Sequence, residues 1–232
     1  ASRFQILDEM SAACINGDIR AMIVSGPPGV GKSFGVEQQL EKASLFDKIA
    51  GKKLRYEVVK GATTALGLYA KLYEYSRDGD VLVFDDCDSV FKDEDAVNLL
   101  KGALDTYDKR LITWNTSIRE DELPRMFEFT GGVVFISNRP TNKIDQALRT
   151  RSMCIDLSMT LDQKIERMGV IMNTDSFMPG VPASYKADAL RLIKDNASEA
   201  REVSLRTLIT VTKIRAENDS DWKDLALYSL VA

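Results

Sequence analysis

The chain has 232 residues, of which 31 are basic and 35 are acidic, and it contains no histidine. The net charge of −4 gives no indication of a nucleic-acid coating, so any such contact would need a local basic patch. The lack of histidine excludes His-dependent catalytic triads and His-ligated metal sites.

Helices and short apolar runs alternate along the first part of the chain. Apolar residues at helical spacing predict amphipathic helices, and short continuous apolar runs predict buried strands. In chain order, the expected elements are a helix at Phe4–Asn16, a strand at Ile19–Val24, a helix at Phe34–Lys42, a strand at Leu54–Lys60, a helix that is capped by Thr63 or Thr64 and ends before Gly79, and a strand at Val81–Asp86.

A glycine-rich loop between the first strand and its helix carries the main chemical signal. In the pattern G-x-x-x-x-G-K-[ST], backbone N–H groups cradle a triphosphate, the lysine reaches the β- and γ-phosphates, and the serine hydroxyl ligates Mg²⁺. We therefore expect ATP and Mg²⁺ as ligands; a chance glycine-rich turn is the alternative. The pattern is matched at every fixed position, and the residues expected to line the nucleotide are Gly26, Pro27, Pro28, Gly29, Val30, Gly31, Lys32, Ser33 and Phe34.

The strand at Val81–Asp86 is expected to bring acidic residues beside this loop. Ligands bind at the carboxyl ends of the strands in parallel sheets. Asp85 is therefore expected to hold the hydration shell of Mg²⁺, and Asp86 to orient or deprotonate the attacking water. The alternative is a strand that stops in an acidic turn. Asp88, a third acid in this segment, fits the role of a loop or helix-capping residue better than a catalytic role.

The second half of the chain continues this alternation and then changes to helices alone. Asn138 ends an apolar run, and we expect it to bond the attacking water or the γ-phosphate; a turn residue before Arg139-Pro140 is the alternative. The change after Leu157 predicts two domains, residues 1–157 and 158–232. The remaining expected elements are a helix at Glu94–Thr106, hairpin arms at Leu111–Trp114 and Met126–Phe129, a strand at Val133–Asn138, a short helix at Ile144–Leu148 and a strand at Met153–Leu157.

Three cysteines and the absence of a long apolar run bear on the compartment. Cys14, Cys87 and Cys154 lie far apart, without the spacing of a metal site, and an odd number suits a reducing compartment. No apolar run is long enough to cross a membrane, and no signal peptide is visible. We therefore expect a cytoplasmic protein without membrane contact.

Taken in order, these motifs resemble those of AAA+ ATPases over nearly the whole chain. Residues 26–33 resemble the Walker A loop, Val81–Asp86 resembles Walker B, and Asn138 resembles sensor 1. The resemblance implies a Mg²⁺-dependent ATP hydrolase. It also implies an α/β fold with a five-stranded parallel sheet of order 5-1-4-3-2 and a small helical lid domain at residues 158–232.

Three arginines extend the resemblance. Arg151, and with it Arg149, is similar to the arginine finger that follows the short helix. Arg206 lies in a segment, Ser204–Leu208, that resembles the sensor 2 helix. The family usually forms a homo-oligomeric ring, often a hexamer, in which the finger faces the neighbour's γ-phosphate. The resemblance therefore implies a ring. An isolated monomer would lack the arginine that stabilises transition-state charge at its own nucleotide.

Two departures from the family pattern bear on the function. Asp86 stands where the family usually has glutamate, so the water must come closer or hydrolysis is slow. The loop after the second strand, Val59–Thr63, lacks the aromatic residue of protein-unfolding members and carries Lys60. A basic residue there favours a grip on nucleic acid.

These features favour a ring ATPase that acts on nucleic acid, with DNA as a possible partner, in replication, recombination or packaging. Such a protein would contact DNA through Lys60, Lys109, Arg110, Trp114 and Arg119. A solvated hairpin face is the plain alternative, because acidic residues occupy the same turn. Remodelling of a protein partner and small-molecule kinase activity are the alternative functions. The small size is similar to that of ATPases encoded by bacteriophages.

Overall fold

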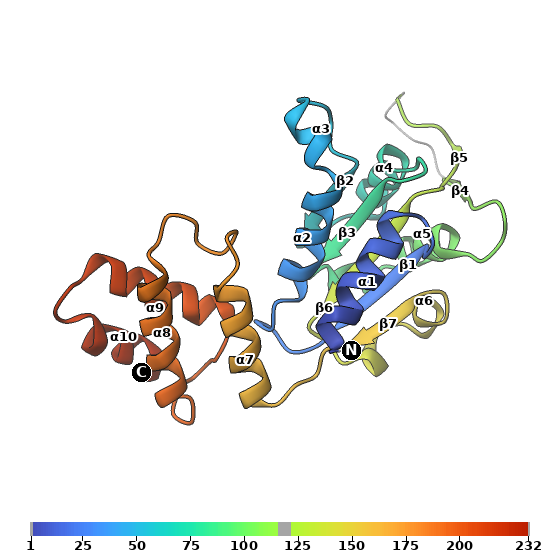
Figure 1. The fold of residues 1–232 in the computed structure, drawn as a ribbon. Coiled ribbons are helices and arrows are strands. Elements are labelled where there is room, and N and C mark those ends of the chain that lie inside the picture. Colours follow the sequence, from blue (N-terminus) through green and yellow to red (C-terminus); the bar gives the residue numbers. More distant parts are fainter. Residues whose placement is uncertain (1, 116–121, 232) are drawn as a thin grey trace. The chain divides into compact units, whose positions relative to one another are not determined.

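The structure, a computed structural model, describes residues 2–115 and 122–231, and the chain divides into two compact units (Figure 1). The first unit comprises residues 1–26 and 32–157, and the second comprises residues 27–31 and 158–232. The glycine-rich segment 27–31 therefore groups with the helical part of the chain, although it follows the first strand in sequence. The two units therefore cannot be separated at one position in the sequence, although the chain passes from the first to the second after Leu157.

A five-stranded parallel sheet forms the centre of the first unit. Its strands are β1 (Ala21–Ser25), β2 (Tyr56–Lys60), β3 (Val81–Asp85), β6 (Gly132–Ser137) and β7 (Met153–Asp156). The order β2-β3-β6-β1-β7 confirms the predicted order 5-1-4-3-2. Every residue of β1 and β6 is buried, as expected for central parallel strands. Asp85 is in register with Ile136, and Ser137 with Ser25, so the carboxyl ends of β3, β6 and β1 lie together.

Helices pack against this sheet, and side-chain caps determine where several of them begin (Figure 1). The helices of the first unit are α1 (Arg3–Ile15), α2 (Lys32–Ala43), α3 (Leu45–Ile49), α4 (Ala65–Glu74), α5 (Glu94–Leu104) and α6 (Gln146–Thr150), with short 3-10 helices η1 (Asp88–Lys92) and η2 (Thr141–Lys143); α3 has no buried residue. Thr64 caps α4 by accepting a hydrogen bond from the Gly67 amide at 3.0 Å. Asp93 caps α5 in the same way.

The predicted hairpin forms and packs onto the core beside α4. Its strands, β4 (Leu111–Thr113) and β5 (Met126–Glu128), are antiparallel. Ile112 and Phe127 are buried, and Trp114 lies against Tyr69 with ring centroids 5.4 Å apart. The hairpin is therefore part of the core, and Trp114 contributes to it. Arg119 lies outside the described residues.

The structure contradicts the prediction that Arg110 is available to DNA. Its side chain is buried, and its guanidinium donates to Ala103 O at 2.7 Å and Gly131 O at 3.2 Å. The group also lies over the Phe129 ring, 5.2 Å from its centroid. Burial lowers the pKa of Arg110 to about 10, so the guanidinium stays charged at neutral pH. Backbone carbonyls take the place of water around this charge, which a sequence pattern does not reveal.

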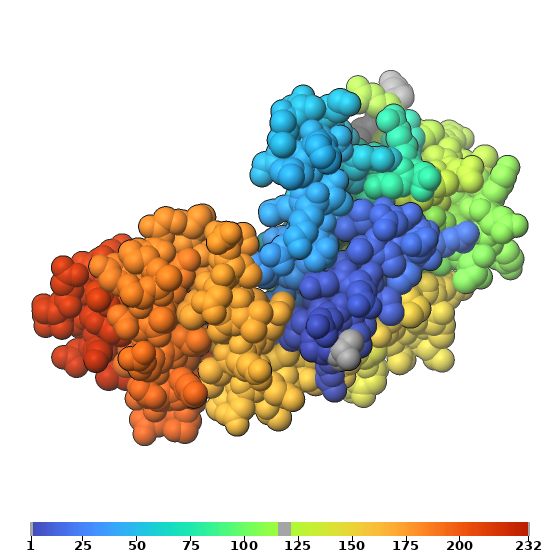
Figure 2. All heavy atoms as spheres, viewed as in Figure 1, coloured from blue at the N-terminus to red at the C-terminus, as the bar shows by residue number. Residues whose placement is uncertain are grey.

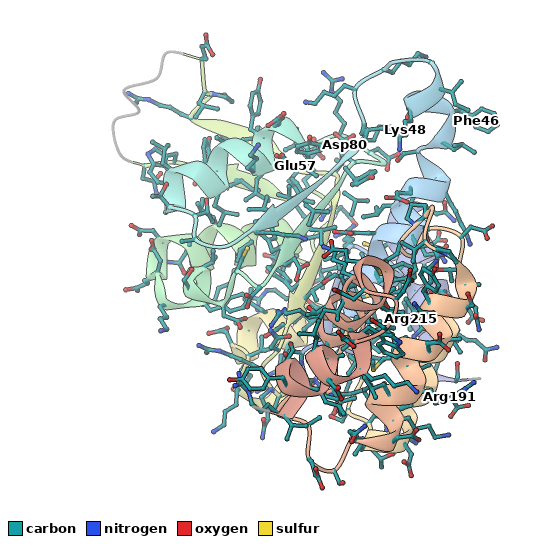
Figure 3. All side chains as sticks on the ribbon, turned by 90° about the vertical axis from the view of Figure 1, so that its left-hand side faces the viewer. Phe46, Lys48, Glu57, Asp80, Arg191 and Arg215 are labelled. Carbon is teal, nitrogen blue, oxygen red and sulfur yellow. The ribbon has the colours of Figure 1, made fainter. Side chains whose placement is uncertain are left out.

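Four helices form most of the second unit: α7 (Leu161–Met172), α8 (Ala183–Asp195), α9 (Leu205–Glu217) and α10 (Trp222–Val231). Thr160 begins α7 with a capping box to Gln163. Arg215 of α9, labelled in Figure 3, lies over the rings of Tyr185 and Trp222 at 4.2 and 5.5 Å. This cation therefore joins α8, α9 and α10.

Candidate nucleotide-binding site

The carboxyl end of the sheet holds the carboxylate and the hydroxyl that the sequence assigns to Mg²⁺. Asp85 is the last residue of β3, and Ser33 lies in the first turn of α2. Ser33 Oγ donates a hydrogen bond to Asp85 Oδ2 at 2.7 Å. The Asp85 side chain remains 13% exposed. These two oxygens therefore form a polar pair that keeps some access to solvent.

Lys32 connects the start of α2 with the end of β6. Its side chain is buried, and Nζ donates to Gly26 O at 2.9 Å and to Asn138 Oδ1 at 3.0 Å. The Asn138 amide uses its oxygen for this bond, so its NH₂ group keeps its donors for another partner. The structure thus brings together two predicted site residues that lie far apart in sequence.

The two acids after β3 differ in their surroundings. Asp86 is exposed, and its backbone has a φ of 56°, which is uncommon for a residue with a side chain. Its amide donates to Ile136 O at 3.1 Å, which holds the turn against β6. Asp88 instead accepts a hydrogen bond from Ser137 Oγ at 2.9 Å and pairs with Arg139 at 3.6 Å. Asp88 therefore serves the local structure, while the Asp86 carboxylate faces solvent.

Lys60 and Glu37 adjoin the Ser33–Asp85 pair. Lys60 Nζ lies 3.9 Å from Asp85 Oδ2 and 3.9 Å from Glu37 Oε1. Burial raises the pKa of the Glu37 carboxyl, and the charge of Lys60 opposes this shift. The lysine that the sequence assigned to DNA thus has carboxylates as its neighbours, although its side chain is 65% exposed. Sequence reasoning missed Glu37; its place one helical turn after Ser33 was the available signal.

The segment 27–31 lies against the N-terminus of α9 within the second unit. Gly29 has a φ of 73°, and a Cβ there would stand 2.2 Å from Ser204 Cβ. The Leu205 amide donates to Gly29 O at 3.3 Å. A Cβ on Gly31, whose φ is 91°, would stand 2.4 Å from Ile171 Cδ1. Both backbone conformation and close packing therefore require glycine at position 29.

Each of the three predicted site arginines has partners close in sequence. Arg149 Nε donates to Ile144 O at 3.0 Å, and Arg151 donates to Ala147 O at 2.8 Å. In the described part of the chain, neither bonds the Lys32 or Asp85 side chain. Arg206 belongs to the second unit, where its side chain is 80% exposed and lies 3.8 Å from Glu202. The hydrogen bonds of Arg149 and Arg151 and the ion pair of Arg206 are therefore local, and the roles of these arginines at a nucleotide stay predictions.

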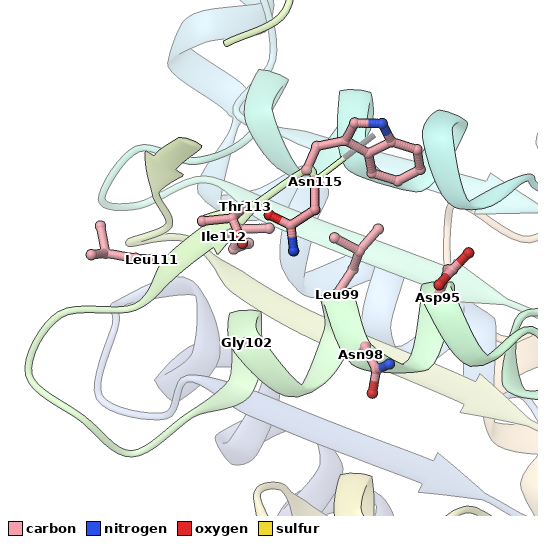
Figure 4. A pocket seen from close by; sticks show the side chains of 9 residues that line it. Asp95, Asn98, Leu99, Gly102, Leu111, Ile112, Thr113 and Asn115 are labelled. Carbon is pink, nitrogen blue, oxygen red and sulfur yellow. The ribbon is translucent and has the colours of Figure 1, made fainter. Parts of the chain in front are cut away.

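Two further observations bear on ligands. A cavity of about 270 Å³ lies between α5 and β4, lined by residues that include Asp95, Asn98 and Asn115 (Figure 4). None of the residues predicted to bind the nucleotide or Mg²⁺ lines it, whereas Trp114 does. Among residues 2–115 and 122–231, no three Cys, Asp or Glu side chains cluster as metal ligands, and no helix is long and apolar enough to span a membrane.

Comparison with solved structures identifies the same fold elsewhere. Domain III of the Thermotoga maritima replication initiation protein DnaA matches with a TM-score of 0.57 and 14% identity, covering 98% of this chain and 90% of that one. Caenorhabditis elegans PCH-2 matches with a TM-score of 0.50 and 17% identity, covering 97% of this chain. The chain spans 65% of the length of the PCH-2 chain. At these identities, the likeness shows the fold alone.

Sequence comparison identifies the family. An uncharacterized 36.7 kDa protein from the nrdC-mobD intergenic region of Enterobacteria phage T4 is 33% identical over 240 residues, which cover 97% of this chain and 72% of that protein. The model of the ATPase family associated with various cellular activities (AAA) matches residues 22–162. This span begins within β1 and runs past β7 into α7, so it includes the strands and loops described above. The chain therefore belongs to the AAA family of ATPases.

Proposed function

We propose that this chain binds ATP with Mg²⁺ and hydrolyses it to ADP and phosphate. The observation that carries the proposal is the pair of hydrogen bonds Lys32–Asn138 and Ser33–Asp85, which bring four predicted site residues together in two pairs. Lys32 would exchange its present partners for the β- and γ-phosphate oxygens. Residues Gly26 to Phe34 would surround the triphosphate.

Ser33 and Asp85 are the proposed ligands of Mg²⁺. Mg²⁺ keeps several waters and takes one or two protein oxygens together with phosphate oxygens. A serine hydroxyl and a carboxylate 2.7 Å apart fit this requirement. When bound, the ion would neutralise charge that develops on the phosphates.

Asp86 and Asn138 are the proposed residues that act on the attacking water. The exposed Asp86 carboxylate would accept a proton from the water as oxygen attacks the γ-phosphorus and the bond to ADP breaks. The NH₂ group of Asn138, whose donors the bond to Lys32 does not use, can donate to the γ-phosphate. The conformation of Asp86, held by the hydrogen bond that its backbone N–H donates to Ile136 O, supports a fixed position for this acid.

We further propose that catalysis takes place in a homo-oligomeric ring, usually a hexamer in this family. Arg151 and Arg149 would stabilise transition-state charge on a neighbouring copy's nucleotide, and Arg206 would contact the nucleotide from the helical unit. A guanidinium has five N–H donors. Arg151 and Arg149 each donate one hydrogen bond to a backbone carbonyl, so each keeps donors for phosphate.

Nucleic acid is the first candidate for the macromolecule on which this ATPase acts. The likeness in fold to a replication initiation protein favours it. A protein partner is the second candidate. The burial of Arg110 favours it, because this removes one basic residue of the hairpin from possible contact with nucleic acid. The exposed basic residues that remain described on the hairpin are Lys109 and Arg125.

One experiment tests these proposals together. ATP hydrolysis is measured with and without DNA, alongside the mass in solution with a slowly hydrolysed ATP analogue. Stimulation by DNA that falls with salt and is lost in Lys109→Glu/Arg125→Glu would support nucleic acid, because phosphate contacts release counterions. A rate that DNA does not change would contradict the nucleic-acid candidate, and a monomer with the analogue would contradict the ring.

A further inference from the structure

The segment between α2 and β2 carries an apolar projection outside the core. The helix α3, Leu45–Ile49, contains no buried residue. Leu45, Phe46 and Ile49 are 51%, 84% and 75% exposed. Figure 3 shows Phe46 pointing away from the ribbon, and Figure 2 shows the light-blue atoms of this segment protruding from the first unit. Three large apolar side chains exposed together on one short helix indicate an interaction surface.

An apolar groove lies between α7 and α8 of the second unit. Its volume is about 560 Å³. Ile165, Met172 and Leu190 line it, together with the small residues Gly169 and Ala187. A Cβ on Gly169 would stand 3.4 Å from Leu190 Cδ2, so the glycine lets the groove extend down to the leucine. The groove is therefore an apolar surface against which the exposed apolar side chains of α3 could pack.

Charges border both surfaces. The α7 side of the groove carries Asp162 and Glu166, and the α8 side carries Arg191 and Lys194. The helix α3 carries an acid and a base next to each other, Asp47 and Lys48, of which Lys48 is exposed. A segment with both signs can match a groove that is acidic on one side and basic on the other in only one orientation.

We propose that α3 of one copy docks into the α7–α8 groove of a second copy of this chain. Phe46 fills the groove, while Lys48 faces Glu166 and Asp47 faces Arg191. The contact joins two different patches, so each copy offers one α3 and one groove. Repetition of such a heterologous contact generates a ring or a filament. This inference rests on the oligomer in the proposed function and names surfaces that assemble it.

The size of the contact indicates how it works. A phenylalanine buries roughly 150–250 Å², whereas a stable interface buries at least about 1,000 Å². The α3 contact alone is therefore too small to hold two copies together, and we expect it to strengthen assembly that the nucleotide promotes. Loss of the Phe46 side chain should weaken assembly by about 10- to 100-fold.

The first test measures mass in solution against protein concentration with a slowly hydrolysed ATP analogue. Phe46→Glu should need about 10- to 100-fold more protein to assemble than the wild type. Tyr107→Glu is the matched control, because Tyr107 is an aromatic residue that is 72% exposed and lies on neither surface. Lys48→Glu and Glu166→Lys should each weaken assembly, and the double variant should restore it.

The second test identifies the pair of surfaces by cross-linking. In a Cys154→Ser background, which leaves only buried native thiols, Ala50→Cys and Ala187→Cys are made in separate chains. A short bis-maleimide should join the two variants when they are mixed. Cross-links within a chain that carries both cysteines, without cross-links between mixed chains, would overturn the proposal.

The outcomes separate this inference from the proposed ring. If the wild type assembles with the analogue but Phe46→Glu and Lys48→Glu assemble as Tyr107→Glu does, the α3 contact is wrong and the ring stands. If the wild type stays monomeric, both the ring and the α3 contact are wrong. Hydrolysis of ATP by a monomer would leave the proposed chemistry intact.

Discussion

Replacement of Lys32 by alanine tests the nucleotide site most directly. Its Nζ donates hydrogen bonds to Gly26 O and Asn138 Oδ1, and the residue is only 5% exposed. With ATP bound, we expect the ammonium to exchange these for two phosphate oxygens. A hydrogen bond to a charged group contributes about 1.5–3 kcal/mol. Two such bonds amount to about 3–6 kcal/mol, of which the two bonds given up offset about half, so Lys32→Ala should raise the Kd for ATP by about 10- to 10²-fold.

The assay is a titration with fluorescent ATP in the presence of Mg²⁺. Lys42→Ala is the matched control, since Lys42 lies on the same helix but is exposed in its last turn. Thermal unfolding of both variants shows whether the fold is retained. A folded Lys32→Ala protein whose Kd stays within about threefold of the wild type would refute the assignment of the phosphate site, because a tenfold change is already 1.4 kcal/mol.

Three further predictions follow from the same geometry. Asp86→Asn should keep ATP and Mg²⁺ binding but lose turnover, because an amide cannot take a proton from water; loss of turnover only in Asp88→Asn would move the catalytic acid. Arg151→Ala should bind ATP yet hydrolyse it on the order of 10³-fold more slowly, and mixing it with Lys32→Ala should restore part of the rate; full activity would contradict a finger at this position. Arg110→Met should lower the free energy of unfolding in urea by about 3–6 kcal/mol, because two charge-assisted hydrogen bonds are lost; an unchanged midpoint would show that they contribute nothing net.

The burial of Arg110 changes how the basic residues of this chain are interpreted. The sequence pattern groups Arg110 with Lys60 as contacts for DNA. In the structure, Arg110 holds α5 and the start of β6 together through Ala103 O and Gly131 O. Lys60 lies near Asp85 and Glu37, so its charge acts within reach of the proposed Mg²⁺ ligands. Arg110 is therefore not available to DNA, whereas the Lys60 side chain is 65% exposed and its contact with DNA stays a prediction.

The sequence alone was sufficient for the sheet and for the type of ligand. Buried parallel strands appear as continuous apolar runs, so Ala21–Ser25, Val81–Asp85 and Gly132–Ser137 could be found from composition and length. The phosphate loop is local in sequence, since its glycines, Lys32 and Ser33 act within one turn between a strand and a helix. The strand order came from the family resemblance, and the structure confirms it.

Only the tertiary structure decided which polar groups meet. The Lys32–Asn138 bond joins residues 106 positions apart, and the place of Glu37 beside Lys60 depends on the packing of α2 against β2 and β3. The fit of Gly29 against Ser204 likewise depends on a segment far along the chain. A residue's type and its neighbours in sequence determine its local conformation and its charge. Its burial and its partners depend on which distant segments pack against it, and local patterns do not carry that information.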